Sequence, residues 1–200
     1  MASCGKTTAV DTLYRITEEQ EKDITPQGSL TKIDKADGAT LYFDRGIFLQ
    51  QKNEKKLFYH VYTVAGQSQY APLRTKVFSG TDGVIFMVDS QTHLFEDNID
   101  SLKELKKVSQ GVLIKDIPLL VMLNKQDLNE VIGVKEFQQI LKDEGLWYDP
   151  PHKLANWNPI IYETCALYDK KKDIYNSFAE CARRTLMYHV LGNGSAPIDQ

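Results

Sequence analysis

Gly5, Lys6 and Thr7 follow one another in an order that serves phosphate chemistry. In a loop of the form G-x-x-x-x-G-K-[ST], backbone amides surround phosphate oxygens, the lysine binds the β- and γ-phosphates, and the hydroxyl binds Mg²⁺. The sequence therefore predicts a magnesium contact from Thr7. The residues that we expect to contact phosphate in this loop are Ser3, Cys4, Gly5, Lys6, Thr7 and Thr8.

This loop is cut short, because its first glycine would stand one position ahead of Met1. A phosphate loop also follows a parallel core strand, and no strand precedes Cys4 in the sequence as given. We therefore expect either a fragment of a longer chain or a protein whose phosphate site is degraded. Taken alone, residues 5 to 8 would also fit a helix start with a solvated lysine.

Three later segments add to the phosphate loop, and they occur in a fixed order. They are Thr63-Val64-Ala65-Gly66-Gln67, Asn124-Lys125-Gln126-Asp127 and Glu163-Thr164-Cys165-Ala166-Leu167. The second and third each follow a short apolar run. In type, order and separation these segments resemble the switch and guanine motifs of small GTPases.

The resemblance implies a role for each residue of a guanine site. Asp127 would accept hydrogen bonds from guanine N1 and its exocyclic amine, which adenine cannot supply, so the wrong base would leave a carboxylate unpaired. Asn124 would tie this loop to the phosphate loop, and the stem of Lys125 would cover the ring. The amide of Ala166 would donate to the guanine carbonyl oxygen, with Cys165 beside it.

Four stretches narrow the resemblance to one group of GTPases: Thr40 to Asp44, Tyr62 to Gln67, Asp82 to Val84, and Val88 to Gln91. They resemble the MglA-type GTPases of bacterial polarity and their archaeal relatives, and the likeness extends over residues 3 to about 188. Most small GTPases carry aspartate where Thr63 stands, whereas this family carries threonine. Asp89 is the nearest acidic residue that could strengthen the surroundings of the magnesium ion.

The same resemblance implies how hydrolysis would proceed. Gln67 would orient the attacking water, and Gly66 would sense the γ-phosphate through its amide. Thr40 would bind Mg²⁺ when GTP is bound, with Thr31 as the alternative. Family members that carry their own arginine finger place it where Ala39 stands, so we expect slow hydrolysis unless a partner supplies an arginine.

We therefore expect a cytoplasmic molecular switch that binds GTP or GDP with Mg²⁺ and signals through its switch loops. Arg45 and Arg74 are the nearest arginines, and we expect both to face the surface or a partner. The family suggests roadblock-type α/β dimers as partners, docked on the exposed switch hairpin. Two alternatives stay open: a pseudoGTPase scaffold with impaired nucleotide binding, and a P-loop kinase, which Asp127 and the lack of a basic lid disfavour.

The elements that must position these residues follow from the apolar pattern. Unalternating apolar runs predict parallel strands buried on both faces, at residues 83–89, 117–123 and 159–162. An antiparallel hairpin is expected from strands 41–49 and 57–64 with a turn at 50–56. Helices are expected at residues 9–16, 70–79, 94–110, 134–144 and 172–191, with a long loop at 17–39. This alternation predicts a three-layer α/β/α fold of the P-loop NTPase type, mostly parallel with one antiparallel edge strand and lacking its first strand.

Composition is that of an ordinary globular chain, which we divide into a small GTPase domain at residues 1–192 and a flexible tail at 193–200. A net charge of -3 gives no basic footprint for nucleic acid or an anionic membrane. An apolar run of the roughly 20 residues that a membrane span needs is absent. The aromatic-rich stretch 145–158 could be a partner surface or a folded-back plug, of which we favour the plug. We expect lysines 170–172 to form a solvated helix start.

Overall fold

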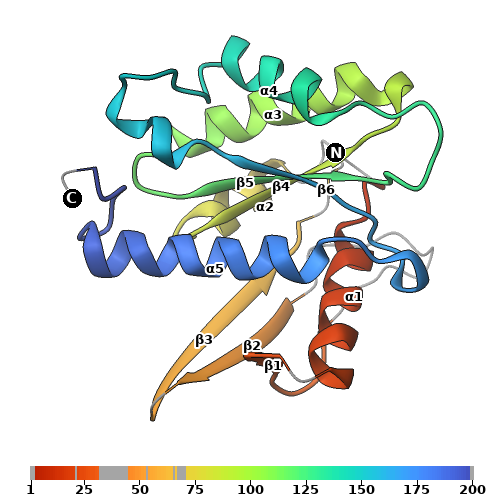
Figure 1. The fold of residues 1–200 in the computed structure, drawn as a ribbon, viewed down its shortest axis with the longest axis vertical. Helices are drawn as coiled ribbons and strands as arrows, with labels where there is room; N and C mark the ends of the chain where they lie inside the picture. Colours follow the sequence, from red (N-terminus) through yellow and green to blue (C-terminus); the bar gives the residue numbers. More distant parts are fainter. Residues whose placement is uncertain are drawn as a thin grey trace.

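The computed structural model describes residues 3–20, 22–31, 45–52, 54–64, 66 and 71–198 (Figure 1). The helices are α1 (Lys6–Glu19), α2 (Ala71–Phe78), α3 (Phe95–Ser109), α4 (Val134–Asp143) and α5 (Ile174–Leu191). The strands are β1 (Ile24–Pro26), β2 (Arg45–Lys52), β3 (Lys55–Tyr62), β4 (Val84–Asp89), β5 (Leu119–Asn124) and β6 (Ile160–Glu163). Short 3-10 helices span Thr92–Leu94, Lys153–Trp157 and Tyr168–Lys170.

Strands β4, β5 and β6 form the parallel sheet that the apolar runs predicted. Every residue of the central strand β5 is buried, which explains why its sequence does not alternate. The register pairs Asp89 with Asn124 and Leu123 with Glu163. The carboxyl ends of all three strands therefore meet at one edge of the sheet, where the polar motifs follow.

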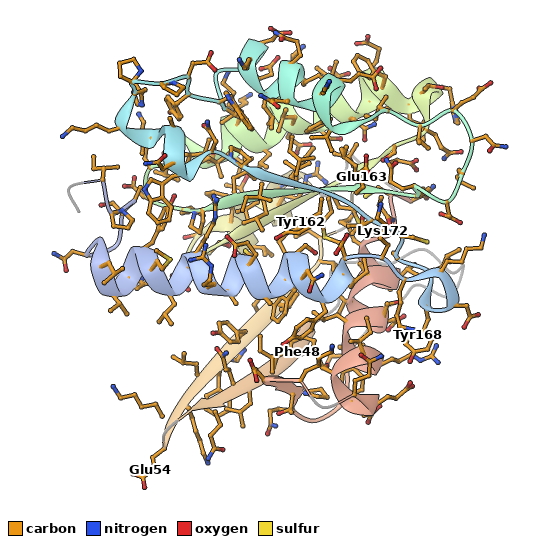
Figure 2. The ribbon with its side chains drawn as sticks, in the orientation of Figure 1. Phe48, Glu54, Tyr162, Glu163, Tyr168 and Lys172 are labelled. Carbon is orange, nitrogen blue, oxygen red and sulfur yellow. The ribbon has the colours of Figure 1, made fainter. Side chains whose placement is uncertain are left out.

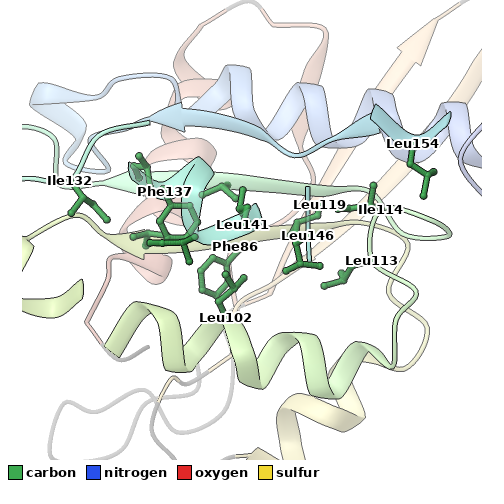
Figure 3. Packing of buried hydrophobic residues seen from close by; sticks show 14 of the residues in the cluster. Phe86, Leu102, Leu113, Ile114, Leu119, Ile132, Phe137, Leu141, Leu146 and Leu154 are labelled. Atoms are coloured by element: carbon green, nitrogen blue, oxygen red, sulfur yellow. The ribbon is translucent and has the colours of Figure 1, made fainter. Parts of the chain in front are cut away.

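Two apolar clusters cover the two faces of this sheet. On one face Phe86 of β4 stacks with Phe137 of α4 at a centroid distance of 6.3 Å, and Leu102 of α3 joins them (Figure 3). On the other face Met87 packs with Leu13 of α1 and residues of α5. Figure 1 shows α3 and α4 above the sheet, with α1 and α5 below it. The three-layer α/β/α arrangement is thereby confirmed.

The strands β2 and β3 of the hairpin reach further into the expected turn than predicted, and a third strand joins them. Pairing continues to Lys52 opposite Lys55, so the strands extend through the expected turn at 50–56. Strand β1 pairs with β2 inside the segment expected to be a loop, and Ile24 in it is 2% exposed. Burial of this one β-branched side chain against α1 outweighs the polar composition of its neighbours.

The structure contains two three-stranded sheets where the sequence predicted one mostly parallel sheet. Within the described residues β3 does not pair with β4, and a cavity of ≈ 290 Å³ lies between them. Its lining is mainly apolar and comes from α1, β3, α2, β4, α3 and α5. The expectation of one antiparallel edge strand is corrected to an antiparallel sheet of its own.

The stretch 145–158 folds back on the domain, as expected. Trp147, Tyr148 and Trp157 pack against the larger core cluster. The Trp157 ring meets that of Tyr188 edge to face, with centroids 5.2 Å apart. Aromatic side chains in a loop thus find cover within the same chain.

Within the stretch 193–198 of the predicted tail, Ala196 packs on the domain. Ala196 is 6% exposed, and its amide donates to the carbonyl of Lys115 at 2.6 Å. Among the helices in the described part of the chain, none has the length and apolar character that crossing a bilayer requires.

Candidate functional site

Asn124, at the carboxyl end of β5, joins three segments of the chain. Its side chain is 2% exposed; Nδ2 donates to the carbonyl of Cys4 at 2.8 Å, and Oδ1 accepts from the amide of Ala166 at 2.9 Å. The hydroxyl of Thr164 donates to the same Oδ1 at 3.4 Å. One side chain therefore holds the phosphate loop against both guanine segments. This confirms the predicted tie between Asn124 and the phosphate loop.

Gly5 allows the phosphate loop to approach Asn124 this closely. Its φ is +99°, and a Cβ at this position would overlap Asn124 Nδ2. Glycine is the residue that adopts this backbone without steric cost. Helix α1 begins directly after it, and in the described chain no side chain caps that start. The backbone amides of the first helical turn and the positive end of the helix dipole favour an anion here.

The other residues predicted to contact phosphate gather at the same helix start. Ser3 is exposed, while Thr7 and Thr8 are half-buried in the first turn of α1. The ammonium of Lys6 lies 3.4 Å from the sulfur of Cys4. All six predicted residues of this loop therefore lie within three positions of the helix start, with their hydroxyl, ammonium and amide groups close in sequence.

Asp127 is placed beside the last guanine segment, as the resemblance implied. Its carboxylate lies 3.2 Å from the Lys170 ammonium and also binds the Cys165 thiol. Burial acts to raise the pKa of Asp127, but the hydrogen bonds from Lys170 and Cys165 outweigh it and hold that pKa below its usual value. Burial raises the pKa of Cys165. Asp127 is thus an ionised acceptor at neutral pH.

The Ala166 amide, predicted to donate to a guanine carbonyl oxygen, donates to Asn124 in this structure. Thr12 of α1 secures the same residue, because its buried hydroxyl donates to the Ala166 carbonyl at 2.6 Å. Cys165 and Ala166 are both buried. The last guanine segment is therefore fixed from both sides before any ligand arrives.

Lys125 adopts a left-handed backbone conformation with φ 68°, and its ammonium lies 2.5 Å from Asp89 Oδ2. The Asp89 carboxylate is 1% exposed and also accepts from the Gln91 side chain at 3.0 Å. We expected Asp89 beside a magnesium ion. In this structure the Asp89 carboxylate is bonded to Lys125 of the guanine loop, and its role beside magnesium stays a prediction.

The cavity between β3 and β4 extends to the phosphate loop, because Lys6, Thr63 and Gly66 all line it. Thr63 is 8% exposed. The switch segment is thus brought beside the phosphate loop. Gln67 and Thr40, predicted for water orientation and magnesium binding, lie outside the described residues, as does the side chain of Arg45.

Arg74 lies on α2 and is paired with Glu104 of α3, with Nη2 2.6 Å from Oε1. Its side chain is 18% exposed. The prediction that Arg74 faces the surface or a partner is therefore corrected: it spans two helices. The physical reason is that a guanidinium binds a facing carboxylate more readily than it stays in a half-buried position alone.

We expected lysines 170–172 to be solvated, and the side chains of Lys170 and Lys172 are 62% and 50% exposed, although each of the three lysines also has a defined neighbour. Lys170 pairs with Asp127, Lys171 lies 3.9 Å from the centre of the Tyr168 ring, and Lys172 lies 3.2 Å from Glu163. Figure 2 shows Lys172 and Glu163 side by side, with Tyr168 near α1. The run precedes α5 and does not open it. No signal in the sequence paired Lys170 with Asp127, which lies 43 positions away.

A model of the ADP-ribosylation factor family matches residues 2–181 of the chain. The chain belongs to this family of Ras-like small GTPases. It is similar to the mutual gliding-motility protein MglA of Myxococcus xanthus (strain DK1622), with 33% identity over 146 residues, 72% of each protein. It is 30% identical to ADP-ribosylation factor-like protein 4A of Homo sapiens over 116 residues, 58% of this chain and 53% of that protein.

Membership in the ADP-ribosylation factor family confirms the resemblance to small GTPases, including the MglA type. Members of this family bind guanine nucleotides and hydrolyse GTP, so these activities are assigned to the chain at family level. The chain spans about half the length of the human relative.

Proposed function

We propose that this protein is a GTPase switch that binds GDP and GTP with Mg²⁺ and reads guanine through Asp127. The contact that carries the proposal is Asn124, which holds the phosphate loop and both guanine segments in one buried network. Such preorganisation lowers the cost of ordering a ligand. An ionised Asp127 at the edge of this network supplies an acceptor that guanine fits and adenine does not.

Magnesium would be held by few protein atoms. Within the described residues, no group of three His, Cys, Asp or Glu side chains could form an all-protein metal site. The hydroxyl of Thr7 is a hard oxygen donor at the start of α1, and Mg²⁺ usually takes one or two protein ligands together with substrate phosphates. This donor set therefore fits the ion; we propose Thr7 and Thr40 as its ligands. When bound, Mg²⁺ neutralises charge on the phosphates.

Hydrolysis by the isolated protein is proposed to be slow. Gln67 would orient water, but the arginine nearest to the cavity, Arg74, is held by Glu104. A partner's arginine typically contributes about 10³ to 10⁵ in rate. Single-turnover hydrolysis should therefore be slow and rise when a cognate partner is added, and a fast rate in the isolated chain would contradict this.

The hairpin of β2 and β3 is the proposed docking surface for a roadblock-type α/β dimer. Phe58 is 55% exposed and Tyr62 43% exposed, and the two share one face of β3 because strand side chains alternate. We propose that this association takes place in the cytoplasm. Phe58→Ser should weaken binding to such a dimer without changing the affinity for nucleotide. Lys55→Ser, at the far end of the same strand, serves as the control.

The alternative is a scaffold with impaired nucleotide binding, and the cavity between β3 and β4 favours it. Both strands have an unpaired edge there within the described residues, and buried backbone groups need partners. An apolar strand added ahead of Ser3 could pair with these two edges, and a glycine at its end would complete the phosphate-loop motif. Lys6, the first residue of α1, lines this cavity.

Titration with fluorescent GDP tests the switch against the scaffold. The chain should bind GDP in preference to ADP. Asp127→Ala should weaken GDP binding at least about a hundredfold, because the guanine N1–H and exocyclic amine would lose their acceptor. Asp149→Asn, which removes an exposed carboxylate paired with Lys142, should leave binding unchanged. A version with an apolar strand and glycine ahead of Ser3 runs in parallel. Binding by neither version would favour the scaffold.

A further inference from the structure

Asp89 has a buried carboxylate that the proposed hydrolysis mechanism does not use. It ends β4, directly opposite Asn124 in the parallel register. Asn98, which is fully buried, holds the Asp89 backbone by accepting from its amide at 3.1 Å and donating to its carbonyl at 2.8 Å. Gln91 bonds the carboxylate from the other side. Asp89 is therefore a rigid acceptor.

The cation facing this acceptor is Lys125, whose two ends are both fixed. Its backbone lies between Asn124 and Gln126, and the Gln126 amide donates to the Thr164 carbonyl at 3.1 Å. Its ammonium lies 2.5 Å from Asp89. The four methylenes of Lys125 therefore have a restricted path between its fixed backbone and its fixed ammonium. The side chain lies beside the guanine segments and is 28% exposed.

We propose that Asp89 is a positioning residue for the nucleoside: it anchors the Lys125 ammonium so that the aliphatic stem is already in place to cover the base. This inference rests on the proposed function and deepens it. A free lysine stem would have to be ordered on binding, which costs affinity. Asp89 thus acts on the base end of the ligand and contributes nothing specific to phosphate or Mg²⁺.

Affinity measurements with GDP and GTP test this role. Asp89→Asn keeps the shape but removes the charge, and it should weaken both nucleotides equally, by roughly threefold to tenfold, the cost of ordering one long side chain. The loss should be the same in Mg²⁺ and in EDTA. A loss that appears only in Mg²⁺ would show that Asp89 serves the metal, and an unchanged affinity would also overturn the proposal.

A second variant removes the lysine side of the Lys125–Asp89 contact and leaves the buried carboxylate in place. Lys125→Met keeps an apolar stem but removes the ammonium, and it should show the same threefold to tenfold loss. The double variant should bind no more weakly than either single one, because both break one contact. Additive losses would assign Asp89 a general structural role instead. Full affinity in Lys125→Met alone would likewise overturn the proposal.

Asp149→Asn is the matched control, since it removes a carboxylate that pairs with Lys142 at 2.8 Å on a distant surface. It should bind GDP like the unchanged chain. If the unchanged chain binds no guanine nucleotide, the proposed function fails and the inference with it. If the unchanged chain binds GDP and Asp89→Asn binds equally well, only the inference fails.

Discussion

Asn124 shows at the residue scale how one side chain can assemble a site from distant segments. It reaches Cys4, 120 positions away, and Ala166, 42 positions away. Both partners are buried, so neither can turn to water if Asn124 is lost. A buried donor or acceptor left without a partner costs free energy. The same residue therefore serves both stability and ligand binding.

Asn124→Ala should lower the free energy of unfolding by about 2–4 kcal/mol, because it leaves the Cys4 carbonyl and the Ala166 amide unpaired. Urea titration of the ligand-free chain measures this. Asn176→Ala removes an exposed amide that bonds Asp173 at 2.8 Å, and it should change stability by less than about 0.5 kcal/mol. Equal effects of the two substitutions would contradict the buried network.

Cys181 predicts how stability depends on alkaline pH. Burial raises the pKa of its thiol from 9.0 to about 12. The unfolded chain therefore loses this proton at a lower pH than the folded chain. The stabilisation is complete below the unfolded pKa and is lost as pH rises toward the folded pKa.

Between about pH 9 and 12, the unfolding free energy should fall more steeply in the unchanged chain than in Cys181→Ala, by up to about 1.4 kcal/mol per pH unit. Urea midpoints measured at several pH values give both slopes. Tyrosines contribute equally to both proteins, so the difference isolates the thiol. Parallel slopes over this range would show that Cys181 is accessible to solvent.

At the element scale, α5 holds the stretch 145–158 through Arg184. This side chain is 6% exposed and donates to the carbonyls of Trp157 at 3.2 Å and Asn158 at 2.8 Å. It also binds Glu180, as its neighbour Arg183 does. Both arginines bind the Glu180 carboxylate, but Arg184 also donates to the two half-buried carbonyls of the stretch 145–158. Comparing Arg184 with Arg183 therefore distinguishes anchoring of the stretch 145–158 from a surface ion pair.

Arg184→Met should destabilise the protein by about 2–3 kcal/mol, because two half-buried carbonyls lose a charged donor. Arg183→Met removes a side chain that is 55% exposed, and exposed ion pairs contribute less than about 1 kcal/mol. Urea unfolding with equal m-values allows the two to be compared. If Arg183→Met proved the more damaging change, the anchoring role of Arg184 would be wrong.

At the scale of the whole molecule, ligand binding and folding are linked. Within the described residues, the two three-stranded sheets share no backbone hydrogen-bond ladder, and a cavity lies between them. A ligand that contacts the start of α1 and the ends of β5 and β6 would bridge the parts on both sides of this cavity. Binding only the folded state raises stability.

GDP at a hundred times its dissociation constant should therefore stabilise the chain by about 2.7 kcal/mol, whereas ADP should not. Thermal unfolding with each nucleotide measures the shift. The Asp127→Ala chain should lose the response to GDP while its own melting temperature stays close to that of the unchanged chain. A similar shift with both nucleotides would indicate general phosphate binding without reading of the base.

Much of this protein follows from local sequence. Unalternating apolar runs predict the three parallel strands, and the position of Asp89, Asn124 and Glu163 after them follows because parallel strands end at one edge. The helices at 71–78, 95–109, 134–143 and 174–191 were expected within a few residues. The ordered segments around Gly5, Gly66, Asn124 and Ala166 together indicated a GTPase.

Tertiary structure decided what depends on partners far apart in the chain. Strand β1 forms because Ile24 is buried against α1, although its local sequence resembles a loop. Lys170 meets Asp127, and Lys125 meets Asp89, only because the ends of the strands converge. The split into two sheets has the same origin, since pairing is a property of two edges and no single segment encodes it. The local apolar pattern of the sequence therefore determines most helices and strands, whereas the partners of individual side chains depend on the tertiary fold.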